Sequence, residues 1–432
     1  MAAASAFVLL AVLFALLGSG VWIALSLLGV AAVAFLAYTD APLMQIVGTT
    51  YWGSSASWSL ASLPLFIWMG EILFRTRLAQ DLFAGLSPWV DRLPGRLLHT
   101  NVIGCGIFAA VSGSSAATAA TVGKITVPEL LRRGYPRDIT LGSIAGSGTL
   151  GLLIPPSIVM IVYGVAAEVS IGQLFVAGVL PGVLLMALFS GYIAAQAMLR
   201  RSEFPPGGPA TGFAEKLRAL RNLVPVSCLI SAVIATIYAG VATPTEAAAF
   251  GVAGALLISA GSGSLTRSAL LDSLRGTVCT TSMIGLILVA AAVLSAAMAF
   301  LGIPRDLAAS IGAMGLSKFQ LVAAICALYI VLGCFLDGIS MIVLTTAVLL
   351  PLVQAAGIDM VWFGIFVVLV VEMSCVTPPV GFNLFVIQGM TGESIGVVAR
   401  AAFPFFLLMV VAVATITLFP DLVLFLPRQM TH

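Results

Sequence analysis

Long apolar runs separated by short polar segments are the dominant pattern of this chain. They lie near residues 5–18, 21–38, 58–74, 138–165, 172–199, 222–240, 244–261, 277–301, 360–388 and 401–426. A helix crosses the hydrocarbon core of a bilayer with about 20 apolar residues, so each run predicts a membrane-crossing helix. A further segment near 78–94 is amphipathic. We therefore expect an all-α, polytopic membrane protein.

Two more apolar stretches are too long for one crossing and are interrupted near their middle. The stretch at about 97–131 contains Ser112-Gly113-Ser114-Ser115, and the stretch at about 319–355 contains Asp337-Gly338. We predict that each is a re-entrant hairpin, in which two half-depth helices meet at a tip. Non-helical backbone survives at membrane depth only where protein or a wet cavity satisfies it, so such tips tend to line sites. The alternative is a single kinked and tilted helix.

The two halves of the chain repeat each other. Four prolines each have a counterpart 223 positions later: Pro128, Pro155, Pro156 and Pro181 pair with Pro351, Pro378, Pro379 and Pro404. In so apolar a protein, a half-chain repeat indicates a transporter built from two like halves with its site between them. We place the first repeat at 1–200, with a broken helix at about 138–165, then a cytoplasmic linker at 201–221. The second repeat covers 222–432, with a broken helix at about 360–388.

The basic residues predict opposite orientations for the two repeats. If the hairpins do not cross, each half makes five crossings, and an odd number inverts the second half relative to the first. With the linker in the cytoplasm, only Arg305, Lys318 and Arg428 lie outside, and Lys124 lies within the hairpin. This asymmetry is the one that the positive-inside rule describes. Both termini are then external.

Composition supports the membrane assignment and excludes several functions. Hydrophobic residues make up 61% of the chain, charged residues 8%, and the mean hydropathy is +1.16, whereas soluble domains carry about 25% charge. A net charge of +2, without a nucleic-acid-binding motif, gives no reason to expect a nucleic-acid partner. Six cysteines without a CxxC pair and two scattered histidines predict neither disulfides nor zinc. No HExxH, GxSxG or Walker pattern supports an enzyme.

Polar groups gather at four interruptions of the apolar runs. The tips offer Ser112, Ser114, Ser115, Thr118 and Thr121 in the first half, and Gly333, Asp337, Gly338, Ser340, Thr345 and Thr346 in the second. The broken helices contain Gly146-Ser147-Gly148-Thr149-Leu150-Gly151 and Glu372-Met373-Ser374-Cys375-Val376-Thr377, each before a Pro-Pro pair. Freed carbonyls and hydroxyls are hard oxygen ligands for a small cation, while half-helix N-termini suit an anion. We infer cation-coupled anion uptake, unless the hydroxyls only bond within their own turns.

Two acidic residues, Asp337 and Glu372, lie within apolar runs. A charge there costs at least about 3 kcal/mol on insertion scales, so each is a candidate site residue. The alternative for Glu372 is that it caps or braces a broken helix. We expect a structural role for Lys124, and we expect Glu246 in the first turn of a helix, where acid stabilises the helix dipole.

Three segments carry a resemblance to a known family. Residues 112–119, 148–157 and 377–385 read SGSSAATA, GTLGLLIPPS and TPPVGFNLF. They resemble the large membrane subunit of tripartite ATP-independent periplasmic (TRAP) transporters, and the resemblance covers essentially the whole chain. One departure is Ser374, where the family usually has glycine, and it puts the local geometry of the second broken helix in question.

The resemblance implies a sodium-driven secondary transporter of the bacterial inner membrane that works by an elevator mechanism. It implies two or more sodium ions, a small four-helix membrane subunit, and a periplasmic binding protein that delivers an organic acid such as a C4-dicarboxylate or sialic acid. It implies one sodium site at Ser112, Ser114, Ser115, Gly146 and Thr149, and another at Gly333, Asp337, Gly338 and Thr377. It also implies substrate contacts at Ser115, Thr118, Thr149 and Asn383.

A stand-alone sodium- or proton-coupled carboxylate or ion transporter of similar inverted-repeat fold is the alternative function. The two hypotheses differ in their partners, which neighbouring genes would reveal. The sequence does not name the substrate, because recognition is shared with the delivering protein and the few polar groups fit many carboxylates.

Overall fold

The computed structural model describes residues 2–39, 41–75, 78–205, 212–306, 309, 317–333, 336–378 and 381–430, and these form helices without a β-strand. The first half contains α1 (Ala2–Gly18), α2 (Ile23–Tyr38), α3 (Leu43–Ser55), α4 (Ser62–Phe74), α5 (Leu78–Val90), α6 (His99–Ser112), α7 (Ser115–Arg132), α8 (Arg137–Leu153), α9 (Ile158–Ala166) and α10 (Ile171–Leu199). The second half contains α11 (Phe213–Tyr238), α12 (Pro244–Gly261), α13 (Arg267–Phe300), α15 (Lys318–Leu332), α16 (Gly338–Ala355), α17 (Met360–Cys375), α18 (Phe382–Thr391), α19 (Ile395–Leu418) and α20 (Asp421–Leu424). The predicted all-α fold class is confirmed.

The helices fall into long spans and shorter apolar pieces. Four of the described helices, α10, α12, α13 and α19, are long and apolar enough to cross a membrane, and three sharply bent pairs bring the total to seven. Shorter apolar helices include α6 and α15, which end at the predicted tips, and α17, which ends before a proline. The chain therefore contains several helices long enough to cross a membrane, together with several shorter apolar helices.

The first tip is a glycine turn between α6 and α7. Gly113 has a φ of +56°, in the left-handed region that favours glycine. A Cβ atom at Gly113 would also lie 3.2 Å from the Ile158 side chain and from the Pro156 carbonyl oxygen. Both the backbone angle and the close packing therefore explain why glycine stands at the tip.

The Pro-Pro pairs interrupt helices, as the sequence predicts. The first broken helix ends at Leu153 and resumes as α9 at Ile158, with a bend of 41°. Ser157 caps α9 by accepting a hydrogen bond from the Met160 amide at 3.4 Å. The second broken helix ends at Cys375 and resumes as α18 at Phe382, and Pro379 lies outside the described residues.

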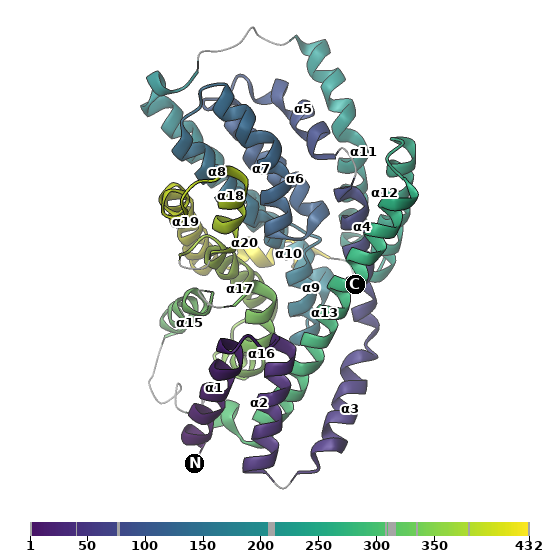
Figure 1. Cartoon of the computed structure of the whole chain (residues 1–432), viewed down its shortest axis with the longest axis vertical. Coiled ribbons are helices and arrows are strands. Elements are labelled where there is room, and N and C mark those ends of the chain that lie inside the picture. The colour runs from purple at the N-terminus through teal and green to yellow at the C-terminus, as the bar shows by residue number, and fades with distance from the viewer. Residues whose placement is uncertain are drawn as a thin grey trace.

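Contacts between helices, both within and between the two halves, follow the same 223-residue offset as the prolines. The first-half pair α1 and α2 packs together, as does its second-half counterpart α11 and α12. Likewise α2 packs on α13, and α12 packs on α4. The second helix of each hairpin lies against the other half: α7 packs on α18, and α16 packs on α9 (Figure 1). The halves thus interlock around α8 and α17, which contact each other.

Several boundaries differ from the sequence predictions. Helix α3 was not predicted, because residues 43–55 contain polar residues and form no long apolar run. Helix α13 begins at Arg267 instead of near residue 277, because Thr266 caps a polar turn before the apolar run. Helix α11 begins at Phe213, inside the predicted linker, whose residues 206–211 lie outside the described part. The last long helix is α19, at 395–418 instead of 401–426.

Helix α12 begins as predicted, with Glu246 in its first turn. The Thr243 hydroxyl accepts a hydrogen bond from the Glu246 amide at 3.3 Å, and the Glu246 carboxylate accepts one from the Thr243 amide at 2.8 Å. This reciprocal capping box satisfies donors that a helix start leaves free. Glu246 therefore stabilises the start of α12.

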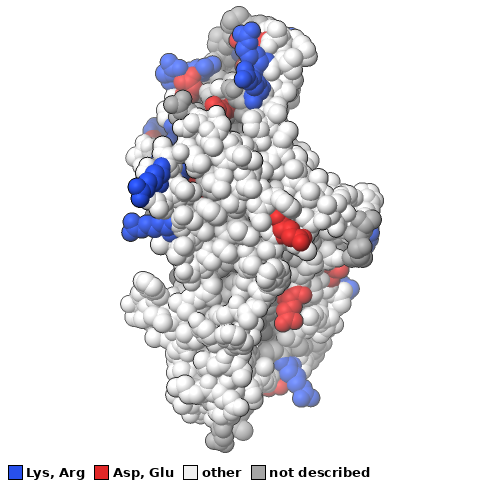
Figure 2. Space-filling view, turned by 90° about the vertical axis from the view of Figure 1, so that its right-hand side faces the viewer, with Lys and Arg blue, Asp and Glu red and all other residues white. Residues whose placement is uncertain are grey.

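Basic residues are unevenly distributed over the surface. In Figure 2, most of the visible Lys and Arg lie on the upper part of the face, at the end of the molecule where α10 ends and α11 begins in Figure 1, and a few lie lower on the right. Two arginines lie at the end of α7 and directly after it. Arg132 and Arg133 form ion pairs with Glu129 at 2.6 and 2.7 Å. The predicted orientation in the membrane requires such a grouping.

Candidate functional site

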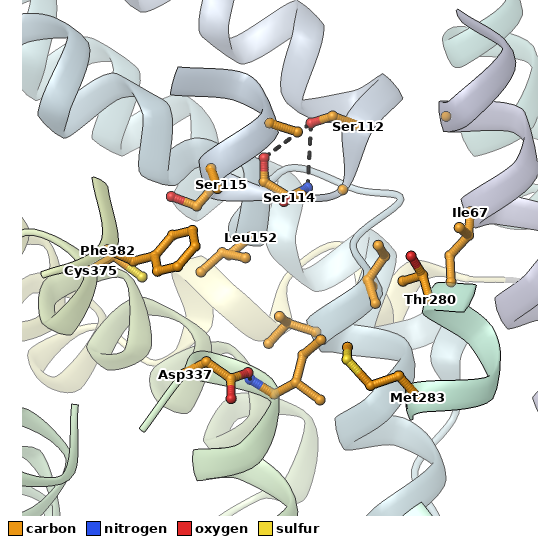
Figure 3. Close-up of a pocket in the computed structure, with 18 of the residues that line it drawn as sticks. Ile67, Ser112, Ser114, Ser115, Leu152, Thr280, Met283, Asp337, Cys375 and Phe382 are labelled. Atoms are coloured by element: carbon orange, nitrogen blue, oxygen red, sulfur yellow. Dashed lines mark hydrogen bonds between the residues drawn. The ribbon is translucent and has the colours of Figure 1, made fainter. Parts of the chain in front are cut away.

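Both predicted tips open onto one pocket of about 470 Å³ (Figure 3). The first tip contributes Ser112 to Ala117, and the second contributes Gly333 and Leu336 to Ile339. Leu152, Phe382 and Cys375 lie between Asp337 on one side and Ser114 and Ser115 on the other. Interruptions that lie more than 200 residues apart in the sequence therefore meet at one place.

The first tip is held by its own hydroxyl groups. The Ser112 hydroxyl donates to the Ser114 carbonyl at 3.2 Å and lies 2.6 Å from the Thr118 hydroxyl, which donates to the same carbonyl at 2.8 Å. Ser115 donates to the side-chain oxygen of Asn383 at 2.8 Å, which joins the tip to α18. No side chain caps the start of α7. The first-turn amides of α7 are therefore available to an anion in the pocket.

The second tip carries its own negative charge. The Asp337 carboxylate accepts hydrogen bonds from the amides of Ile339 and Ser340 at 3.1 and 3.3 Å, and another from the Ser340 hydroxyl. Asp337 is thus the N-cap of α16, and it is exposed to the pocket. The two tips are chemically different: the first offers helix amides and hydroxyls, and the second offers a carboxylate.

Helix α8 supports the first tip from behind. A Cβ atom at Gly151 would lie 2.5 Å from the Ser114 carbonyl oxygen and 2.8 Å from the Thr118 hydroxyl. Gly146 and Thr149 are buried further along α8, away from the pocket lining, and the Thr149 hydroxyl donates to the Gly146 carbonyl at 2.8 Å. These two candidate ligands therefore lie outside the pocket lining that contains Ser112, Ser114 and Ser115.

The remaining candidate site residues also fall into two groups, those that line the pocket and those that do not. Gly333, Asp337 and Gly338 line the pocket. Thr377 is not among the lining residues, and its hydroxyl donates to the Met373 carbonyl at 2.7 Å. Asn383 is fully buried behind Phe382, and its amide donates to the Ala145 carbonyl at 3.3 Å. It therefore connects α18 both to the first tip and to α8.

Ser374 is accommodated by a glycine on the opposite element. A Cβ atom at Gly333 would lie only 2.1 Å from the Cβ atom of Ser374, and the Ser374 hydroxyl donates to the Val371 carbonyl at 2.7 Å. Helix α17 continues through Ser374 to Cys375. The serine is therefore compatible with a regular helix because residue 333 has no side chain.

Sequence reasoning missed one wall of the pocket. Helix α4 contributes Glu71 and Phe74, and α13 contributes Thr280 and Met283. The Glu71 carboxylate accepts a hydrogen bond from Arg75 at 3.0 Å. The two residues form an ion pair and lie one helical turn apart. Glu71 could have been found, because it is an acidic residue inside the apolar run at 58–74. Thr280 and Met283 carry no such signal.

The ligand types of the pocket match an alkali cation better than a transition metal. Within the described ranges, no three His, Cys, Asp or Glu residues come together. The available groups are hydroxyls, carbonyls and the carboxylates of Asp337 and Glu71, which are hard oxygen ligands, and Glu71 is already paired with Arg75. None of the described residues that line the pocket is Lys or Arg. An anion would therefore be recognised by backbone amides and hydroxyls.

Comparison with known proteins identifies the family. The family model described as "Tripartite ATP-independent periplasmic transporter, DctM component" matches residues 10–422. The chain belongs to this TRAP transporter family. It is 32% identical to a C4-dicarboxylate TRAP transporter large permease protein of Pseudomonas aeruginosa, over 87% of both chains. It is 32% identical to an ectoine TRAP large permease of Halomonas elongata, over 85% of this chain and 86% of that one.

One further relative agrees with this assignment, and one solved structure shares the fold. A sialic acid TRAP transporter large permease protein of Vibrio cholerae is 29% identical over 96% of both chains. The solved structure of the YdaH transporter of Alcanivorax borkumensis has a TM-score of 0.65 at 14% identity, covering 93% of this chain and 98% of that one. The chain is thus the large permease subunit of a TRAP transporter, and not an enzyme.

Proposed function

We propose that this TRAP subunit couples the entry of sodium to the import of a small organic acid across a bacterial inner membrane. The observation that carries the proposal is the meeting of two unlike tips at one pocket. An uncapped helix start suits the carboxylate of the substrate, and the Asp337 carboxylate suits a cation.

In this proposal, sodium binds at the oxygen groups around each tip. The residues that would hold one ion are Ser112, Ser114, Ser115, Gly146 and Thr149, and those that would hold another are Gly333, Asp337, Gly338 and Thr377. Of the residues predicted to contact substrate, Ser115 lines the pocket and would touch it, whereas Thr118, Thr149 and Asn383 are buried and would support that contact from outside the lining. Because anion and cations lie at one pocket, each neutralises the charge of the other, and binding of the two is coupled.

We further infer that the tips move relative to α4 and α13, as an elevator mechanism requires. Glu71, Phe74, Thr280 and Met283 lie on helices that pack together and with α2 and α12, and that also contact the hairpin helices α6 and α16. A small membrane subunit would hold these helices in place, and a periplasmic binding protein would deliver substrate. Among the described residues, none forms a separate soluble domain that could capture substrate.

The substrate class follows from pocket size and from relatives. A volume of about 470 Å³ is within the usual range for small-molecule sites. Relatives are named for C4-dicarboxylates, ectoine and sialic acid. We propose a small organic acid, which backbone amides and hydroxyls would recognise without a basic side chain.

Reconstitution tests this function. The large subunit, the small subunit and the loaded binding protein are combined in proteoliposomes with an inward sodium gradient, and accumulation of a labelled carboxylate is measured. We expect accumulation that stops when sodium is replaced by choline or when either partner is omitted. Uptake by the large subunit alone would instead support the stand-alone transporter.

A further inference from the structure

Glu372 is a buried acid without a structural partner. Among the acidic side chains of the described residues, it is the one that is fully buried. Neither of its carboxyl oxygens has a hydrogen-bond partner in the described part of the chain, and no described Lys or Arg forms an ion pair with it. A buried charge without compensation is strongly unfavourable. Glu372 is therefore either protonated or close to a cation that binds, and the second case makes it a candidate counter-charge.

The neighbours of Glu372 belong to the first half of the chain. Its carboxyl group lies beside the Thr149 hydroxyl and the backbone amide of Leu153, where α17 crosses α8. Thr149 does not use its hydrogen on Glu372, because it donates to the Gly146 carbonyl at 2.8 Å. Thr149 therefore lies between a carbonyl and a carboxylate, and its own oxygen is left as an acceptor.

The contact between Glu372 and Thr149 joins two positions that correspond in the 223-residue repeat. Glu372 lies 223 residues after Thr149, and Asp337 lies 223 residues after Ser114. At both positions, a hydroxyl in the first half is matched by a carboxylate in the second half. The second proposed sodium site thus has a carboxylate of its own, whereas the ligands proposed for the first site are all neutral. Glu372, in the second half, lies beside Thr149, a member of that neutral set in the first half.

We propose that Glu372 supplies the negative charge of the first sodium site, from the opposite half of the protein. This inference rests on the proposed function, because it assumes that a cation binds at the group that includes Gly146 and Thr149. Glu372 lies beside Thr149, from where it would attract the ion through the low-dielectric core. Each of the two sodium sites would then have one carboxylate, and both carboxylates would come from the second half of the chain.

Removing this charge while keeping the shape gives a direct test. The sodium concentration for half-maximal uptake is measured in the complete reconstituted transporter for the wild type, Glu372→Gln and Glu372→Asp. We expect Glu372→Gln to raise this sodium concentration at least about tenfold, which corresponds to ~1.4 kcal/mol. Glu372→Asp should raise it less. Thr126→Val is the matched control, because Thr126 is also buried without a hydrogen-bond partner, on α7 and outside the proposed sites. Its sodium dependence should equal that of the wild type.

Thermal unfolding distinguishes two roles of Glu372: a negative charge that attracts sodium, or a side chain that only stabilises the fold. In choline chloride, Glu372→Gln should be at least as stable as the wild type, since it removes an uncompensated buried charge. Sodium chloride should stabilise the wild type and not the Gln variant. Loss of stability in both salts, or unchanged sodium dependence in Gln, would overturn the inference. If Gln cannot be purified, an unchanged sodium requirement in Asp together with sodium-insensitive unfolding would do so. A wild type without sodium-dependent uptake would instead refute the proposed function itself.

Discussion

Asp337 has two separable roles in this account, as the cap of α16 and as a sodium ligand. Replacing it with Ala removes the acceptor for the Ile339 and Ser340 amides at 3.1 and 3.3 Å. Loss of an N-cap costs about 1 kcal/mol, whereas Asn caps nearly as well as Asp. Asp337→Asn should therefore fold like the wild type, and Asp337→Ala should be less stable by ~1 kcal/mol. Both variants lose the charge that faces the pocket.

The assay combines thermal unfolding with sodium-dependent uptake in the complete reconstituted transporter. We expect both variants to need at least about ten times more sodium for half-maximal uptake, because a site with few ligands loses its only carboxylate. The comparison is informative because stability and sodium dependence should change independently. If Asp337→Asn keeps the sodium dependence of the wild type, then Asp337 is only a helix cap, and the reasoning about the second tip is refuted.

Other predictions follow from close contacts and from the topology. Gly151→Ala should lower the uptake rate at least about tenfold, because a Cβ atom 2.5 Å from the Ser114 carbonyl must displace the first tip; normal uptake would mean that the tip geometry is unimportant. Gly333→Ala should abolish uptake and Ser374→Gly should restore it in the double variant, since the two Cβ atoms would lie 2.1 Å apart; additive defects would contradict this. Cysteines introduced at Arg133 and Lys318 should react with an impermeant thiol reagent from opposite sides of the membrane, and labelling from the same side would disprove the inverted repeat.

Local backbone chemistry explains why much of the fold could be predicted. Gly113, with its positive φ, and the Pro155-Pro156 pair interrupt helices by their own covalent structure, so their effects appear in the sequence. Helix α3 and the early start of α13 were not predicted, since their polar residues break the apolar pattern on which the assignment of spans relies. Capping by Thr266 is a local signal that could have extended α13.

The candidate site was only partly predictable because it depends on packing between distant helices. The polar tips were found because Ser112 and Asp337 lie at breaks in apolar runs. Thr280 and Met283 resemble any other residues of an apolar helix, and only the tertiary structure brings them to the pocket. The fit between Gly333 and Ser374 also needs coordinates, since a single sequence does not reveal which side chain faces a given glycine.

The central claim is that sodium and substrate pass through the protein together, and simultaneous flux measurement tests it most directly. Labelled sodium and a labelled carboxylate are followed in the same proteoliposomes, which contain the large and small subunits, after addition of loaded binding protein. The account predicts that substrate entry is accompanied by proportional sodium entry, and that Asp337→Asn reduces both fluxes by the same factor. Substrate entry without any matching sodium entry would contradict it.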